Sequence, residues 1–383
     1  RYAMLQNHRL FDVDAHVLLS PVMWRDLPEA YAVRRPRPIR LDDASDLGRV
    51  RTAWFVDGRV SPHAFGLGAH PSKTPEAVMS EYGAKLDTTE LPPSSLDMSD
   101  PEARLRDMDR KGIDIQVIFP TPHYAQMTVD PGFEAALFRS YNRYIARQCR
   151  RSPERLKWAG LLPLRDAREG CEAVTEMVAL GASAVLVFGT VGERLLSDCY
   201  FTPVWEAVAR SRLPVCVHMG MSFTPYEQLT QSVFDAHIMG MCLPVHLAFV
   251  ALVGHGMLDR YPDMKVAFLE FGSEWLLYMV PRMDHYLPLN RSKFLPGVHP
   301  FPQQAIQDYV KSGRIFLAPE SEDRLLPIEM ELFGENQFLY ASDIPHGEGR
   351  HDAASVILKR TDLSDTQKQK ILYDNAARFY GNP

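Results

Sequence analysis

The 383-residue sequence has few cysteines, and none of them form a C-x-x-C pair. Its five cysteines are scattered, and an odd number argues against a complete disulfide framework. We therefore expect reduced thiols and a cytoplasmic protein. No stretch approaches the roughly 20 consecutive apolar residues that a membrane span requires. The amino end also lacks the basic-then-apolar pattern of a signal peptide.

The sequence has no excess of positive charge. A formal net charge of -6 and an isoelectric point near 6.1 provide no basic field that would hold nucleic acid or an anionic bilayer. We therefore expect neither nucleic acid nor membrane as a partner. Hydrophobic residues make up 46% of the chain and charged residues 23%, which is typical of a globular protein with a large core.

Strand-like and helix-like segments alternate along most of the chain. Eight apolar runs, most of them hydrophobic throughout, predict parallel strands at 11–17, 113–119, 156–162, 182–188, 213–218, 264–270, 314–317 and 337–342. Helical patterns lie between and after them, at 100–112, 131–151, 166–180, 203–211, 245–260, 275–286 and 365–380. This alternation predicts an α/β fold, a (β/α)₈ TIM barrel spanning residues 1–383 as a single domain, with a doubly wound open sheet as the alternative.

Residues 20–100 interrupt this alternation. They are rich in proline and glycine but also carry aromatic residues, which disordered linkers rarely do. Long irregular segments inside a compact domain are usually functional. We therefore expect an insertion after the first strand that forms a lid over the carboxyl ends of the strands.

Polar residues stand at the carboxyl ends of several predicted strands. In a barrel these ends converge on the active site, and a buried carboxylate or imidazole without a partner is costly. A shared divalent metal would satisfy all of them, and the predicted metal ligands are Asp14, His16, His218, Glu270 and Asp343. Each also has an ordinary alternative: Asp12 or Asp14 could begin a turn, His16 or His218 could be a core histidine bonded to backbone, and Asp343 could cap a helix.

Five segments occur in a characteristic order between Phe11 and Gly381: D-V-D-A-H, P-V-C-V-H-M-G, D-R-Y-P-D-M-K-V-A-F-L-E-F-G-S-E-W, Y-A-S-D-I-P-H and I-L-Y-D-N-A-A-R-F-Y-G. In these segments the chain resembles the amidohydrolase superfamily, in particular the branch typified by aminocarboxymuconate-semialdehyde decarboxylase. The resemblance implies a distorted (β/α)₈ barrel whose divalent metal (zinc, iron or manganese) is held by residues aligning with Asp14, His16, His218 and Asp343. It also implies that Asp343 shuttles protons. His346 would orient Asp343, or else be a surface loop histidine.

Glu270 departs from the pattern of this branch, whose decarboxylases usually present a histidine at the end of the sixth strand. A carboxylate there would repel an anionic substrate or bind a second cation. Three roles therefore stay open for Glu270: ligand of a second ion in a site of one or two ions, base near the first ion, or ion-pair partner of a base such as Arg282.

Several further residues are predicted to contact substrate. Methionine and aromatic residues follow the fifth strand, and they form either an apolar binding wall or ordinary core. The predicted substrate-binding residues are His123, Tyr124, Trp54, Met219, Phe223 and Arg282.

The leading hypothesis is a metal-dependent hydrolase in which a metal-activated water attacks an amide, ester or thioester of a small hydrophobic acyl substrate. Asp343, His218 and His346 would be its catalytic residues. The alternative is a non-oxidative decarboxylase of an aromatic or β-keto acid, and a further alternative is an inactive barrel that serves as a binding protein. We expect a homo-oligomer, a dimer.

Overall fold

The structure is a computed structural model. It describes residue 5 and residues 8–40, 52–61, 64–65, 68–69, 93–121, 127–220, 222–223, 225, 229, 233–290, 301–346 and 350–381.

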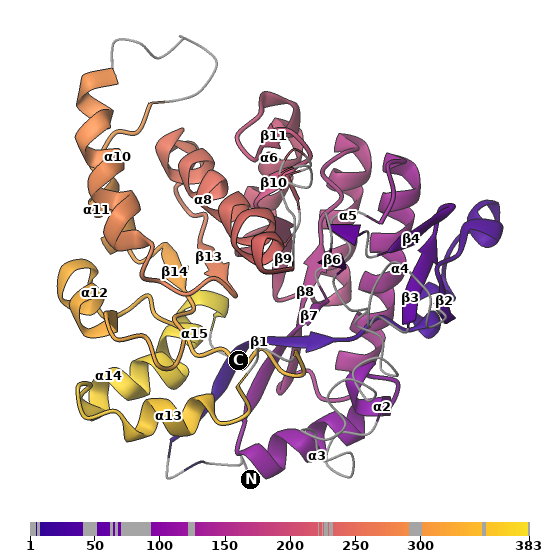
Figure 1. Ribbon diagram of the computed structural model, residues 1–383, viewed down its shortest axis with the longest axis horizontal. Helices are drawn as coiled ribbons and strands as arrows, with labels where there is room; N and C mark the ends of the chain where they lie inside the picture. Colours follow the sequence, from indigo (N-terminus) through magenta and orange to yellow (C-terminus); the bar gives the residue numbers. More distant parts are fainter. Residues whose placement is uncertain are drawn as a thin grey trace.

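A parallel sheet lies at the centre of the fold (Figure 1). Each neighbouring pair of strands is parallel, and nearly every residue in them is buried, which explains their continuous hydrophobic runs. In spatial order the strands are β1 (Phe11–Val17), β7 (Ile115–Pro120), β8 (Leu156–Leu161), β9 (Ala184–Phe188), β12 (Val215–His218), β13 (Val266–Leu269) and β14 (Ile315–Leu317). Seven of the eight predicted strands are thereby confirmed.

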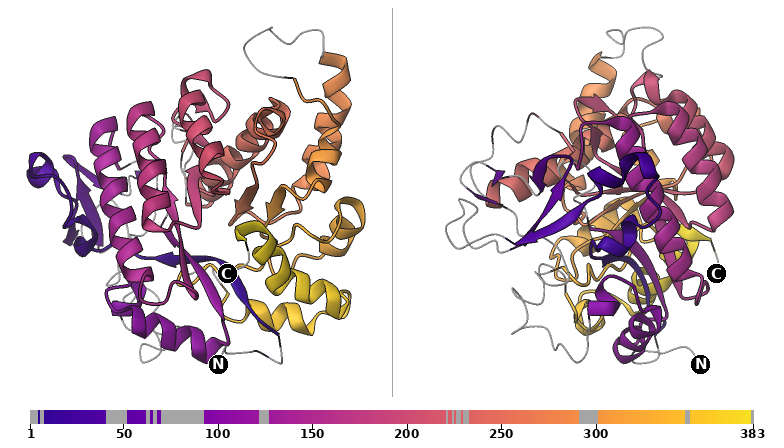
Figure 2. Two further views of the ribbon diagram at one scale, coloured as in Figure 1. Left: turned by 180° about the vertical axis from the view of Figure 1, so that it is seen from behind. Right: turned by 90° about the vertical axis from the view of Figure 1, so that its right-hand side faces the viewer.

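The eighth predicted segment connects the two ends of this sheet. On one side the amide of Leu339 donates to the carbonyl of Leu317 on β14 at 2.8 Å. On the other side the amide of Val13 on β1 donates to the carbonyl of Tyr340 at 3.0 Å. The sheet therefore curls round to meet itself, with helices along its outer side (Figure 2). The structure confirms the predicted α/β barrel class and its distortion.

Most helices form close to their predicted bounds, although the helix predicted at 275–286 extends to Asn290 and the one predicted at 245–260 belongs to a run that begins at Val233. Asp100 caps α3 (Pro101–Lys111) by accepting from the amide of Glu102, and Gly112 ends it with a φ of 72°. Predicted helices also form as α4 (Pro131–Cys149), α5 (Ala167–Leu180), α6 (Thr202–Ser211), α10 (Leu276–Asn290) and the closing run α14 (Asp365–Gln369), η9 (Lys370–Asp374) and α15 (Asn375–Tyr380). Elements not predicted are η4 (Cys199–Phe201), α11 (Ile306–Lys311), α12 (Leu326–Phe333), α13 (Ala353–Lys359) and the hairpin of β10 (Thr190–Val191) and β11 (Arg194–Leu195).

A long apolar helical run corrects one expectation from the sequence. It comprises α7 (Val233–Asp235), η6 (Ala236–Cys242), α8 (Leu243–Phe249), η7 (Val250–Gly254) and α9 (Met257–Arg260). Its 19 residues from Ala236 to Gly254 are long and apolar enough to cross a membrane, contrary to the expectation that no such stretch exists. More than half of this stretch is buried inside the protein, and α8 packs on β9 and β12. Gly189 permits this close packing, because a Cβ there would lie 2.2 Å from the backbone of Pro244.

The described parts of residues 20–100 form small elements, of which some lie beside α4 and one packs on α3 (Figure 1). They are η1 (Pro21–Trp24), η2 (Glu29–Arg34), the antiparallel strands β2 (Arg37–Arg40), β3 (Thr52–Val56) and β4 (Arg59–Ser61), the pair β5 (Ala64–Phe65) and β6 (Gly68–Ala69), and α2 (Pro93–Leu96). Residues 41–51 and 70–92 lie outside the described residues. The lid over the strand ends and the single-domain organisation therefore stay predictions.

One buried carboxyl in the outer layer makes stability depend on pH. Glu329 on α12 is fully buried; Ser273 Oγ donates to one of its oxygens, and the other has no hydrogen-bond partner among the described residues. Burial raises the pKa of Glu329 to about 7. Because the folded pKa lies above the unfolded one, ionisation disfavours the folded state, and stability is lost as the pH rises from about 4.5 to about 7.

We expect Glu329→Gln to raise the melting temperature relative to the wild-type protein at pH 8 and to leave it unchanged at pH 4. The amide removes the ionisation cost, which amounts to at most about 3 kcal/mol at high pH. Thermal unfolding across this pH range measures the difference. The exposed Glu331 lies on the same helix, and Glu331→Gln should follow the wild type throughout. Parallel curves for Glu329→Gln and wild type would contradict the prediction.

Candidate metal centre

The predicted metal-binding side chains converge on one point at the carboxyl ends of the strands. His16 Nε2 lies 3.2 Å from Asp14 Oδ1, 3.2 Å from Glu270 Oε2 and 3.3 Å from Asp343 Oδ1. His218 Nε2 lies 2.8 Å from Glu270 Oε2 and 3.3 Å from His16 Nε2. All five residues therefore meet, although they come from β1, β12, the end of β13 and the eighth segment.

The backbone sets which nitrogen of each histidine faces this point. His16 Nδ1 lies 3.1 Å from the carbonyl oxygen of Pro120, and His218 Nδ1 lies 2.7 Å from that of Met219. Because a carbonyl oxygen only accepts, each Nδ1 carries a hydrogen, and in the neutral form of each imidazole Nε2 presents a lone pair. Such an outer hydrogen bond is typical of metal-binding histidines, whose tautomer it fixes.

The arrangement of these atoms fits a divalent metal. Both oxygens of Asp14, Oε2 of Glu270 and Oδ1 of Asp343 are buried and have no hydrogen-bond partner among the described residues. Facing lone pairs and carboxylates repel one another in a buried place, and a cation between them removes this cost. One atom from each of Asp14, His16, His218 and Glu270 lies within 4.8 Å of the others, a nitrogen and oxygen set that suits zinc, iron or manganese.

Burial and neighbouring charges shift the pKa values of the acids and bases here. Burial raises the pKa of Asp343 to about 6, and the nearby Glu270 charge adds to the shift. Burial alone would lower the pKa of His346, but the Asp343 carboxylate outweighs it and raises that pKa to about 10. Burial would raise the pKa of Glu270, yet the charge of His218 outweighs it and holds that pKa well below its usual range. The protonation state of each of these groups therefore depends on the charge of its neighbours.

The backbone is strained at two of these residues. Glu270 has a φ of 56° and Asp343 a φ of 53°, in the left-handed region that residues with a side chain rarely adopt. Such a conformation costs on the order of 1–3 kcal/mol and persists only where the surroundings enforce it. Glu270 directly follows β13, and Asp343 lies beside β1, where its amide donates to the carbonyl of Asp14 at 2.9 Å. Strain of this kind often marks functional sites.

The sequence analysis did not identify the residues that position the metal-binding residues through hydrogen bonds. Asp12 accepts hydrogen bonds from Gln116 Nε2 at 2.9 Å, from the amide of Ser342 at 2.9 Å and from Ser342 Oγ at 2.6 Å. These bonds join β1 to the residue that precedes Asp343. Arg104 Nη2 donates to the carbonyl of His16 at 2.6 Å. The alternation of aspartates in D-V-D-A-H was the available signal, because it gives Asp12 the same buried setting as Asp14.

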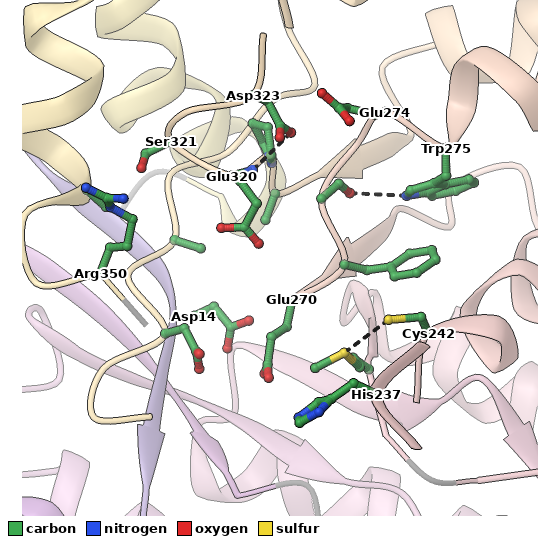
Figure 3. Close-up of a pocket in the computed structure, with 18 of the residues that line it drawn as sticks. Asp14, His237, Cys242, Glu270, Glu274, Trp275, Glu320, Ser321, Asp323 and Arg350 are labelled. Carbon is green, nitrogen blue, oxygen red and sulfur yellow. Dashed lines mark hydrogen bonds between the residues drawn. The ribbon is translucent and has the colours of Figure 1, made fainter. Parts of the chain in front are cut away.

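A cavity of about 690 Å³ opens onto the centre, where the Asp14 and Glu270 carboxylates lie close together (Figure 3). Phe271 and Trp275 line it, with ring centroids 5.5 Å apart and planes inclined by 34°. Further carboxylates line it at Glu274, Glu320 and Asp323. Arg350 is the permanent cation among its described lining residues, and its Nη1 pairs with Glu322 at 3.0 Å. The cavity is thus acidic, with an aromatic wall that the sequence prediction did not name.

The structure brings some of the predicted substrate residues to the cavity and not others. Met219 lines it, with its sulfur 3.7 Å from Cys242 Sγ, whereas Phe223 is not among its described lining residues. Trp54 is buried against Trp24, at a centroid distance of 6.3 Å, so it serves the core of the insertion rather than the cavity. His123 and Tyr124 lie outside the described residues.

Arg282 is also not brought to the cavity. It is exposed on α10, where its guanidinium lies 5.1 Å from the ring centroid of Tyr286. Glu270 faces His16 and His218 instead. The alternative of an ion pair between Glu270 and Arg282 is therefore wrong, because the side chain of Glu270 points into the barrel.

The curled α/β barrel, with carboxylates and imidazoles converging at the carboxyl ends of its strands, is the arrangement of a metal-dependent barrel enzyme. Within this class the chain belongs to the amidohydrolase family, which matches residues 12–382. The resemblance seen in the sequence is confirmed, and the chain is an enzyme of the amidohydrolase superfamily.

Curated relatives and solved structures extend this result. The chain is 26% identical over 333 residues to gamma-resorcylate decarboxylase of Polaromonas, covering 80% of this chain and 95% of the relative. It is 22% identical over 288 residues to 2-amino-3-carboxymuconate-6-semialdehyde decarboxylase of Dictyostelium discoideum, covering 74% and 77%. An amidohydrolase from Mycobacterium avium subsp. paratuberculosis superimposes with a TM-score of 0.76 at 23% identity, covering 98% of both chains. The manganese complex of 5-carboxyvanillate decarboxylase from Novosphingobium aromaticivorans gives 0.71 at 18% identity, covering 99% and 98%.

Proposed function

We propose that the chain is a metal-dependent, non-oxidative decarboxylase of an aromatic or β-keto acid. The relatives named above are decarboxylases, and one solved neighbour holds a nitrobenzoic acid together with manganese. These likenesses favour the alternative drawn from the sequence over the leading hypothesis of a hydrolase acting on a hydrophobic acyl substrate.

The observation that carries the proposal is the aromatic wall beside the metal-binding residues. Phe271 directly follows Glu270 and Trp275 lies five residues after it, and both line the same cavity as Asp14 and Asp343. A cavity of about 690 Å³ is within the range of ligand sites and holds a single-ring acid. A flat ring packed on this wall would have its carboxylate directed toward the metal-binding side chains.

Asp14, His16, His218 and Glu270 would hold a divalent metal. When bound, it would supply positive charge that stabilises the negative charge developing on substrate oxygens. In decarboxylation the bond from the ring carbon to the carboxylate breaks, carbon dioxide leaves, and the ring carbon takes up a proton. Asp343 would deliver that proton, because its carboxylate lines the cavity while its Oδ1 lies 2.7 Å from His346 Nδ1. His346 would orient it.

We propose manganese as the metal, with zinc and iron as alternatives, because one structural neighbour contains manganese. We also propose a cytoplasmic location, which the five free cysteines favour. A homodimer stays a prediction from the sequence.

The proposal is tested by product analysis with the manganese-loaded enzyme. Hydroxybenzoic acids labelled with ¹³C in the carboxyl group should release labelled carbon dioxide and a ring product that carries one solvent hydrogen. In deuterium oxide that hydrogen should be deuterium, since the proton comes through an exchangeable carboxyl group. A parallel panel of thioesters, esters and amides reports hydrolysis. Release of a thiol, alcohol or amine without carbon dioxide would overturn the proposal in favour of a hydrolase.

A further inference from the structure

The cavity carries more negative charge than the metal centre accounts for. Beyond the carboxylates of that centre, three more line the cavity, at Glu274, Glu320 and Asp323. In Figure 3 the carboxylates of Glu274 and Asp323 lie apart from the metal centre, and that of Glu320 extends between them and Glu270. A metal ion at the centre would leave these three charges uncompensated.

No cation among the described lining residues compensates them. Arg350 is the permanent cation there, and its Nη1 lies 3.0 Å from Glu322 and its Nη2 3.2 Å from Asp352. Neither of these partners is among the described lining residues, so the charge of Arg350 is compensated outside the cavity. The amide of Glu320 donates to Asp323 at 3.1 Å, but its carboxylate has no hydrogen-bond or ion-pair partner in the described part of the chain.

The three carboxylates also repel one another. Withdrawal from bulk water raises the pKa of Glu320 to about 7, and the charges of Asp323 and Glu322 add to the shift. Withdrawal from water likewise raises the pKa of Asp323 to about 6, and the charge of Glu274 adds to that shift. A cation bound between these groups would relieve the repulsion.

The cavity is a ligand site on grounds that do not involve these three acids. Asp14 is fully buried and lines the cavity, and neither of its carboxylate oxygens has a hydrogen-bond partner among the described residues. The volume of about 690 Å³ lies in the middle of the range for drug-sized ligands, so a single ring leaves room beyond it. The ligand can therefore extend from the metal centre to the three outer carboxylates.

The spacing of these carboxylates suits an organic cation better than a metal ion. Within the described ranges, every group of three or more donors close enough to hold a metal ion belongs to the metal centre, and Glu274, Glu320 and Asp323 form no such group. Beside them the indole of Trp275 is fixed, because its Nε1 donates to the carbonyl of Gly272 at 3.1 Å. An aromatic face attracts an ammonium group, and nearby carboxylates strengthen the attraction.

We propose that the substrate acid carries a positively charged nitrogen group at the end opposite its carboxylate, and that Glu320 binds this group beside the ring of Trp275. The inference rests on the proposed function, since it places the substrate carboxylate at the metal centre. Glu274 and Asp323 add to the negative field. The same field repels an acid with a second carboxylate at the far end, so the cavity selects by repulsion as well as by attraction.

The experiment measures binding of matched probes to the manganese-loaded full chain by isothermal calorimetry. The probes are benzoic acids whose para substituent is aminomethyl, hydroxymethyl or carboxyl, together with amine and alcohol pairs that have longer spacers. At pH 8 an alkylamine is a cation and Glu320 is ionised. We expect the best amine to bind about tenfold tighter than its alcohol and the dicarboxylic acid to bind weakest. Added salt should reduce this preference.

Glu320→Gln should lose most of the preference for the amine while it keeps its manganese and its affinity for the alcohol. Glu331→Gln is the matched control, because it removes the same charge from an exposed residue of α12 that is not among the described lining residues. It should keep the full preference. If Glu320→Gln fails to fold, the spacer series and the salt dependence of the wild type decide the question.

Equal affinity for amine and alcohol at every spacer length, or an undiminished preference in folded Glu320→Gln, would overturn the inference. Because binding is measured without turnover, the two proposals fail separately. A preference for amines without release of carbon dioxide from any acid would refute the decarboxylase and leave the cation-binding role of Glu320. Release of carbon dioxide without that preference would refute the inference alone.

Discussion

Replacing His218 with alanine is expected to abolish turnover and deplete the enzyme of its metal ion, while the barrel stays folded. The variant removes one of four donors, and losing even an outer hydrogen-bond partner of a metal ligand costs roughly 10–100-fold in metal affinity. Without the ion, the negative charge of the transition state is left unstabilised, which should lower kcat by at least about 10³-fold. Metal analysis after dialysis and assays at saturating Mn²⁺ measure both effects.

The fold should tolerate this change because the neighbouring contacts remain. The other residues of β12 stay buried between β9 and β13, and their backbone hydrogen bonds do not involve the imidazole. Cys216→Ala is the control, since Cys216 is a buried residue on the same strand that contacts Tyr380 instead of the metal centre. It should retain metal and activity. A His218→Ala enzyme with normal turnover would rule out a metal held by this histidine.

The strands were predictable because parallel strands buried on both faces have continuous apolar sequences. The runs at Val215–His218 and Val266–Leu269 illustrate this, since every residue in them is buried. Placing a polar residue at the end of each run then followed from barrel geometry, because strand ends converge. The fold and the convergence of the predicted metal-binding residues could thus be inferred from local pattern together with one topological rule.

The aromatic wall of the cavity could not be predicted from the sequence in this way. Phe271 and Trp275 lie in the turn between β13 and α10, and periodicity does not determine which way a turn directs its side chains. Trp54 was misplaced for the same reason: nothing in the local sequence indicates that it packs on Trp24, 30 positions earlier. For Asp12 the sequence suggested only that it or Asp14 could begin a turn, because its partners Gln116 and Ser342 are distant in the chain. In each of these cases, contacts between residues distant in the chain determine where the side chains lie.

The other large effect is expected for Asp343→Asn. Asparagine has the same shape and tolerates the left-handed φ of 53° at this position, so the backbone should not change. The amide cannot deliver a proton, and loss of a positioned general acid lowers the rate by about 10²–10⁴-fold. We expect kcat to fall by this factor while the KM for the substrate changes little, because the aromatic wall is untouched.

Hydrogen exchange into the product isolates the proton step from the rest of the reaction. The wild-type enzyme, incubated with the decarboxylated ring product in deuterium oxide, should exchange the ring hydrogen at the position that carried the carboxylate. Asp343→Asn should not, even when it holds the metal ion through Asp14, His16, His218 and Glu270. Asp323→Asn is the matched comparison, because Asp323 lines the cavity but contacts the amide of Glu320 instead of the metal centre. We expect it to slow exchange by less than about tenfold, since it removes no general acid. Wild-type exchange rates in Asp343→Asn would assign the proton to another group.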